Sequence, residues 1–106
     1  PRVFTMVRET EDLAGIPHAV TEDDIQVTDA YLGPGYGQSS PEMIEAITLA
    51  ARMEGLILDP VYTGKVMAGM IGAIRGGDFG PGQNLVFLHT GGAPALFGYR
   101  KIFDGV

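Results

Sequence analysis

The amino-acid sequence predicts an α/β fold in which helices and a parallel sheet form three layers. Short apolar or alternating runs at 25–29, 56–58 and 85–88 read as strands, and segments of helical periodicity separate them. The connections between them are short enough for the right-handed crossovers that join parallel strands. We therefore expect the order helix, strand, helix, strand, helix, strand, helix.

Four helices are expected from the spacing of apolar residues and from residues typical of helix ends. The first covers about 2–14 and the second about 40–54. The third covers about 63–75 and contains several glycines, which weaken a helix unless close packing compensates. We expect that packing to be against the sheet. A short fourth helix is expected within 93–99.

The composition restricts the classes of function. The chain has 106 residues, of which 45% are hydrophobic, and a formal net charge of −6. An acidic chain is poorly suited to bind nucleic acid or an anionic membrane, and no run reaches the roughly 18 apolar residues of a membrane span. The lack of cysteine excludes disulfides and thiolate zinc sites, and two isolated histidines offer little to another metal. We expect a globular cytoplasmic protein that binds a small molecule.

Polar residues and glycines follow each of the three expected strands. The first strand leads to the glycine-rich loop 33–38, the second to Tyr62 and Thr63, and the third to Thr90 and Gly91. The carboxyl ends of parallel strands meet at one edge of a sheet, and ligands bind beyond that edge. We therefore predict that these residues surround one planar ligand.

Each residue also has an ordinary structural interpretation. Tyr36 and Tyr62 suit half-buried packing positions whose hydroxyls reach water, and a tyrosine taken alone favours that interpretation. Thr63 suits a helix N-cap, and Thr90 suits a turn after a strand. The glycine pair 91–92 alone is a weak indication of an anion site. The convergence of three strand ends, more than any single residue, supports a site.

Other groups are less favoured as catalysts. Lys65 could form a Schiff base if its pKa were depressed, but an exposed helix lysine is the favoured interpretation. His89 suits a structural histidine beside a core strand, and the amine of Pro1 has no activating partner nearby in the sequence. Gly64-Lys65 lacks the other residues of a P-loop, and 33–37 departs from the dinucleotide fingerprint.

Several stretches of the chain together resemble one enzyme family. They are Gly33-Pro34-Gly35-Tyr36-Gly37, Glu54-Gly55, Leu58-Asp59-Pro60-Val61-Tyr62-Thr63-Gly64-Lys65 and His89-Thr90-Gly91-Gly92-Ala93-Pro94-Ala95-Leu96-Phe97-Gly98-Tyr99. Their order and spacing are similar to the D-cysteine desulfhydrase and 1-aminocyclopropane-1-carboxylate deaminase group of pyridoxal-phosphate enzymes. The resemblance implies that 1–106 is the C-terminal, incomplete portion of the large domain of a tryptophan-synthase-β-like enzyme. It also implies pyridoxal 5′-phosphate as cofactor, a small amino acid as substrate and a homodimeric parent.

The resemblance implies roles for individual residues. Tyr62 resembles the active-site tyrosine that faces the substrate, and Tyr36 resembles the second substrate-side tyrosine. Thr63 stands where the deaminase branch has a glutamate near the pyridine nitrogen, and Thr90 stands where that branch has a leucine. Together with Gly91, these threonines would contact the cofactor. The Schiff-base lysine of the family matches no residue of this chain, so the resemblance implies that the chain alone is inactive.

The two threonines decide between related reactions. A neutral hydroxyl holds the pyridine nitrogen protonated less firmly than a carboxylate does, so Thr63 and Thr90 favour elimination of a good leaving group over ring opening. D-Cysteine desulfhydrase, which yields pyruvate, ammonia and sulfide, is the expected function. Deamination of 1-aminocyclopropane-1-carboxylate and L-cysteate sulfo-lyase activity are alternatives from the same family. A non-catalytic α/β interaction domain is the alternative from another class.

Overall fold

The computed structural model describes residues 2–105, and all regular secondary structure in that range is helical. Three α-helices and two 3-10 helices follow one another as α1 (Arg2–Ala14), η1 (Glu22–Asp24), α2 (Pro41–Glu54), α3 (Thr63–Gly76) and η2 (Ala93–Phe103). The four predicted helices are therefore confirmed, although the last is a 3-10 helix and extends further than expected. None of the helices in the described part is long and apolar enough to cross a membrane.

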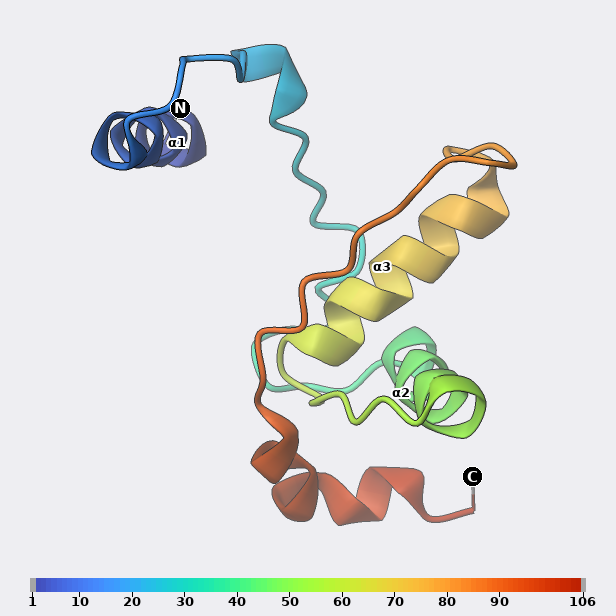
Figure 1. Cartoon of the computed structure of the whole chain (residues 1–106). Helices are drawn as coiled ribbons and strands as arrows, with labels where there is room; N and C mark the ends of the chain where they lie inside the picture. Colours follow the sequence, from blue (N-terminus) through green and yellow to red (C-terminus); the bar gives the residue numbers. More distant parts are fainter. Residues whose placement is uncertain (1, 106) are drawn as a thin grey trace.

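The predicted parallel sheet is absent from residues 2–105, so the three-layer α/β prediction is wrong for this structure. The segments 25–29, 56–58 and 85–88 form no strands. A strand needs a neighbouring strand to satisfy its backbone N–H and C=O groups. Figure 1 shows instead that 85–88, drawn in orange, runs alongside α3. Val86 is 92% exposed, so this apolar run is not the buried central strand that its composition indicates.

The core lies where α2 packs against α3. Its buried residues come from these helices and from the segment that joins them: Met43, Ala46, Ile47, Ala50, Leu58, Met67 and Ala68. Gly64 permits the close approach of the first turn of α3 to α2. A Cβ atom at Gly64 would lie 2.7 Å from Ile47 Cδ1 and 2.7 Å from the carbonyl oxygen of Asp59. Any side chain at this position would therefore have to displace the Ile47 side chain and the backbone at Asp59.

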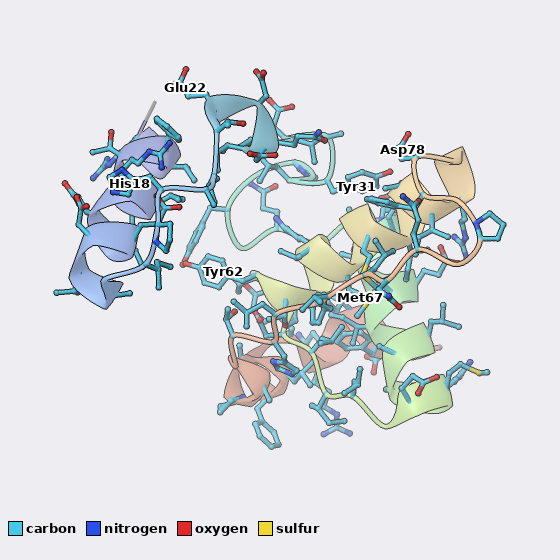
Figure 2. The ribbon with its side chains drawn as sticks, turned by 45° about the horizontal axis from the view of Figure 1, so that its top comes forward. His18, Glu22, Tyr31, Tyr62, Met67 and Asp78 are labelled. Atoms are coloured by element: carbon cyan, nitrogen blue, oxygen red, sulfur yellow. The ribbon has the colours of Figure 1, made fainter. Side chains whose placement is uncertain are left out.

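The glycines further along α3 accommodate an aromatic ring. Tyr31, which precedes the glycine-rich loop, packs its ring on Gly69 and Gly72 (Figure 2). A Cβ atom at Gly69 would lie 3.4 Å from Tyr31 Cδ2, and one at Gly72 would overlap the Tyr31 hydroxyl. Close packing thus compensates for the glycines, as expected, but the packing partner is Tyr31 and not a sheet.

The N-terminal arm, residues 2–25, lies apart from α2 and α3 (Figure 1). The radius of gyration is 16.0 Å, whereas a compact domain of this length would have about 13 Å. Glu11 gives the arm its own local fold, because its side chain accepts hydrogen bonds from the backbone N–H groups of Ala19 and Val20. The site described below therefore depends on the other part of the molecule.

Candidate functional site

Two tyrosine hydroxyls meet at the surface. Tyr36 comes from the glycine-rich loop 33–38, and Tyr62 is the residue immediately before α3. Their hydroxyl oxygens are 3.0 Å apart, and their rings meet edge to face with centroids 5.9 Å apart. Tyr36 is 80% exposed and Tyr62 is 58% exposed, so neither occupies a half-buried packing position. Both side chains are therefore accessible to a ligand, and Figure 2 shows Tyr62 beside the start of α3.

The contact between the tyrosines changes the acidity of Tyr62. The hydrogen bond and the charge interaction with Tyr36 raise the pKa of Tyr62 above its ordinary value, and partial desolvation and the charge of Asp59 add to this effect. Tyr62 therefore keeps its proton at neutral pH. A protonated phenol beside a ligand can donate a proton or a hydrogen bond but cannot act as a base.

Asp59 builds the turn that presents Tyr62. Its buried carboxylate accepts hydrogen bonds from the N–H groups of Val61 at 2.8 Å, Tyr62 at 2.9 Å and Thr63 at 2.9 Å. These groups lie at the start of α3, where N–H groups have no partner within the helix. Burial acts to raise the pKa of Asp59, but the hydrogen bonds from Thr63, Tyr62 and Val61 outweigh it and lower that pKa. The ionised carboxylate thus fixes the backbone on both sides of Tyr62.

The hydroxyl of Thr63 is already engaged in this turn. Thr63 Oγ1 donates to Asp59 Oδ1 at 2.7 Å and accepts the N–H of Asp59 at 2.7 Å, and the residue is only 2% exposed. Thr63 is the first residue of α3, and Tyr62 occupies the N-cap position proposed for it. A hydroxyl has one proton. Thr63 could therefore donate to a pyridine nitrogen only after releasing the carboxylate of Asp59.

The segment that contains Thr90 and Gly91 is fixed by His89. His89 Nε2 lies 3.0 Å from the carbonyl oxygen of Ile57, and the N–H of Gly91 donates to His89 Nδ1 at 3.0 Å. The second bond requires an unprotonated Nδ1, so Nε2 carries the proton and donates to Ile57. Both ring nitrogens of His89 therefore hold backbone groups, which is the structural role expected for this residue.

The same segment approaches Asp59 very closely. A Cβ atom at Gly92 would lie 2.8 Å from Asp59 Cγ, and Gly92 has a φ of +91°, so a glycine is required there on both counts. Thr90 is exposed, which leaves its hydroxyl accessible. The described hydrogen bonds of Thr63 and of the tyrosine pair do not include Thr90.

The three loops predicted to converge do lie together, but around the start of α3 and not at the edge of a sheet. The glycine-rich loop reaches the turn 59–63 through the Tyr36–Tyr62 contact, and 89–92 reaches the same turn through Gly92. Thr90 and Gly91 immediately precede Gly92, and they offer an accessible hydroxyl and open space above a glycine, which leaves room for a planar ligand. No group of acidic or histidine residues within 2–105 could hold a metal ion, and Pro1 lies outside the described residues.

Lys65 is buried, so the prediction of an exposed helix lysine is wrong. It is 8% exposed, and its Nζ donates to the carbonyl oxygens of Leu32 at 2.5 Å and Gly35 at 2.8 Å. The side chain thus reaches from the first turn of α3 into the glycine-rich loop. An amine that donates to two carbonyl groups is not a free nucleophile, so this geometry does not favour a Schiff base at Lys65 either.

Sequence reasoning does not foresee the roles of three residues that shape the site, which are Asp59, Lys65 and Tyr99. Asp59 has a local signal, because an aspartate two to four residues before a helix commonly accepts the N–H groups of the turn. Lys65 and Tyr99 have none. Lys65 contacts carbonyls 30 and 33 residues earlier, and the Tyr99 hydroxyl donates to the carbonyl of Gly37, 62 residues earlier, at 2.8 Å. Contacts over such separations depend on the folded chain.

Comparison with known proteins places the chain in a family. Residues 2–91 match the protein-family model described as "Pyridoxal-phosphate dependent enzyme". The 1-aminocyclopropane-1-carboxylate deaminase of Burkholderia cenocepacia is 44% identical over 102 residues, that of Methylobacterium nodulans 45% and that of Ralstonia nicotianae 42%. Each match covers 96% of this chain and 30% of the relative, so the chain spans about a third of the length of these curated relatives.

Proposed function

Because the chain belongs to the pyridoxal-phosphate dependent enzyme family, we propose that it is part of a lyase that deaminates 1-aminocyclopropane-1-carboxylate. The three relatives compared above carry the name of this activity, at 42–45% identity over 96% of the chain. They support this alternative better than D-cysteine desulfhydrase, which Thr63 and Thr90 favour. The substrate in either case is a small amino acid.

The observation that carries the proposal is the exposed Tyr36–Tyr62 pair. Bound pyridoxal phosphate supplies an electron sink for negative charge that develops on the substrate. Opening a three-membered ring breaks a carbon–carbon bond, and the released methylene then needs a proton. Tyr62 is suited to hold that proton at its hydroxyl oxygen, since Tyr36 raises the pKa of Tyr62. Tyr36 donates to or accepts from Tyr62 and keeps its hydroxyl oriented.

D-Cysteine desulfhydrase is the second candidate, and Thr90 is the observation that favours it. Its accessible hydroxyl is a neutral partner for a pyridine nitrogen, which suits elimination of a thiol better than ring opening. Thr63 supports the desulfhydrase less than the sequence indicates, because the single proton of its hydroxyl is donated to Asp59 Oδ1. Thr63, Thr90 and Gly91 stay predictions as cofactor contacts, as do a homodimeric parent and a cytoplasmic location.

The test uses the complete enzyme that contains this segment, loaded with pyridoxal phosphate. One reaction contains 1-aminocyclopropane-1-carboxylate and the other D-cysteine. Ring opening without loss of carbon yields a four-carbon 2-oxo acid, whereas elimination from cysteine yields pyruvate and sulfide. A four-carbon product at a kcat/KM well above that for sulfide release supports the deaminase. Sulfide release with no four-carbon product rejects the deaminase and selects the second candidate.

A further inference from the structure

We propose that Lys65 is a positioning residue: it holds the glycine-rich loop 33–38 so that the hydroxyl of Tyr36 meets that of Tyr62. The inference rests on the proposed function only in that the tyrosine pair serves the reaction; the contact itself rests on geometry. Lys65 lies three residues after Tyr62, in the first turn of α3. The start of α3 therefore carries both Tyr62 and the Lys65 amine that places Tyr36.

The loop cannot hold its own conformation. Three of its six residues are glycines, and Gly33 and Gly37 have positive φ values of +68° and +67°. Its only described internal backbone hydrogen bond runs from the N–H of Gln38 to the carbonyl of Gly35, at 3.2 Å. Glycine has more backbone freedom to lose on ordering than any other residue. Contacts from outside the loop must therefore fix the place of Tyr36.

Two side chains from outside hold the carbonyl groups on either side of Tyr36. The carbonyl of Gly35 accepts from Lys65 Nζ at 2.8 Å, and the carbonyl of Gly37 accepts from the Tyr99 hydroxyl at 2.8 Å. Lys65 also holds the carbonyl of Leu32 at the start of the loop. A cationic donor makes stronger hydrogen bonds than a neutral one, and burial of Lys65 limits competition from water. Lys65 is therefore the main constraint on Tyr36.

A purely structural role for Lys65 makes a different prediction. In that case its removal would lower stability while the tyrosine hydroxyls stayed 3.0 Å apart in the folded enzyme. If Lys65 positions Tyr36, its removal separates the hydroxyls, and the pKa of Tyr62 falls because the hydrogen bond between Tyr62 and Tyr36 is the main cause of its elevation. The pKa of Tyr62 in the folded enzyme therefore distinguishes the two roles.

The experiment compares Lys65→Met and Lys65→Gln with Lys101→Met in the complete enzyme. Lys101 is the only other lysine of the chain and is exposed on η2, so its substitution removes the same charge elsewhere. Tyrosine labelled with carbon-13 at Cζ reports the titration of each phenol by NMR, and Tyr62→Phe assigns the Tyr62 signal. Tyr36→Phe gives the full downward shift expected when the partner hydroxyl is lost.

We expect Lys65→Met to lower the pKa of Tyr62 by most of the shift seen in Tyr36→Phe, Lys65→Gln to lower it as well, and Lys101→Met to leave it unchanged. We also expect Lys65→Met to reduce kcat/KM by about as much as Tyr36→Phe, with little further loss in the double variant. If Lys65→Met does not fold, Lys65→Gln decides. A folded Lys65 variant with an unchanged Tyr62 pKa overturns the proposal, whichever amino acid proves to be the substrate.

Discussion

The carboxylates of Glu11 and Asp59 are both buried, but only Asp59 lies where separate segments of the chain meet. Glu11 in the N-terminal arm is 4% exposed and accepts from Arg8 Nη1 at 2.7 Å and from two backbone N–H groups. Asp59 is 1% exposed and accepts from three backbone N–H groups and one hydroxyl. In both, burial acts to raise the pKa and the hydrogen bonds outweigh it, so both pKa values are lowered.

The difference lies in what surrounds each carboxylate. The partners of Glu11 all lie within the arm, so its bonds only fold 15–20 back onto α1. Asp59 stands where separate parts of the chain meet, because Gly92 packs on its side chain and Tyr62 is fixed by its bonds. The comparison shows that a buried carboxylate organises backbone locally in either place. It contributes to a site only where other segments reach the same turn.

The largest effect on activity is expected from substitution of Tyr62, whose backbone is fixed by Asp59. The described hydrogen bonds of Glu11 hold no such residue. Tyr62→Phe removes the proton held at the hydroxyl, and kcat/KM of the complete enzyme should fall about 10²–10⁴-fold. Tyr36→Phe removes a single hydrogen bond and should cost about tenfold. Tyr31→Phe is the matched control, because it keeps the ring on Gly69 and should retain near wild-type activity. Equal activity in all three variants would disprove a role for the pair.

Exchanging each carboxylate for its amide tests the comparison directly. In Asp59→Asn the amide NH₂ group faces N–H donors and the charge-assisted bonds are lost, so the free energy of unfolding should fall by about 3 kcal/mol. Activity should fall too, because the backbone of Tyr62 is released. Glu11→Gln should loosen the arm and leave kcat/KM close to wild type. Urea unfolding and steady-state kinetics on both variants provide the measurement, and an inactive Glu11→Gln enzyme would contradict the separation of the two regions.

Lowering the pH should destabilise both the N-terminal arm and the turn 59–63, because the pKa values of Glu11 and Asp59 are both lowered in the fold. The pKa of Asp59 is lower in the folded chain than the ordinary value of about 3.9, so the unfolded chain binds more protons between the two pKa values. The stabilisation by Asp59 is complete above that ordinary value and is lost as the pH falls through the folded pKa. Unfolding free energies measured across this pH range should show a weaker pH dependence in Asp59→Asn than in wild type. A slope unchanged by the substitution would mean that the pKa of Asp59 is the same in the folded and the unfolded chain.

The smallest effect is expected when the 106-residue chain, without the rest of the enzyme, is incubated with the cofactor. After incubation with pyridoxal phosphate and borohydride, the intact mass should show no stoichiometric adduct, because Lys65 Nζ donates to two carbonyl groups and Lys101 lies outside the site. Slow partial labelling at exposed amines is compatible with this expectation. A single adduct that maps to Lys65 would show that the lysine leaves the loop and that the chain binds the cofactor by itself.

The sequence predicts the helices well because their ends are local. Gly55 and Gly77 end α2 and α3 in the left-handed conformation, with φ values of +67° and +86°, and Ser40 caps α2 by accepting the N–H of Met43. The strands fail for the opposite reason. The run 85–88 has strand-like composition, but a strand exists only when another strand pairs with it, and none does within the described residues.

The candidate site divides in the same way. Tyr36 and Tyr62 are predicted from the convergence of the strand ends and from the family resemblance, and the structure places their hydroxyls in contact. The role of Thr63 could not be foreseen, because its burial and its bond to Asp59 depend on the complete turn. Lys65 shows the limit most clearly: helical periodicity leaves it on an exposed face, and only the path of residues 32–35 brings two carbonyl acceptors to its amine.

The contact at Gly64 has a mechanical consequence. Gly64 lies between Thr63 and Lys65, and its α-carbon is too close to Ile47 for even a methyl group to fit. The first turn of α3 is therefore packed tightly against the middle of α2, and we expect the two to move together as one unit. Because this unit carries Tyr62 directly and Tyr36 through Lys65, a displacement of α2 should translate both hydroxyls together and preserve the distance between them. Motion elsewhere in the enzyme would then move the pair as a whole without separating its two members.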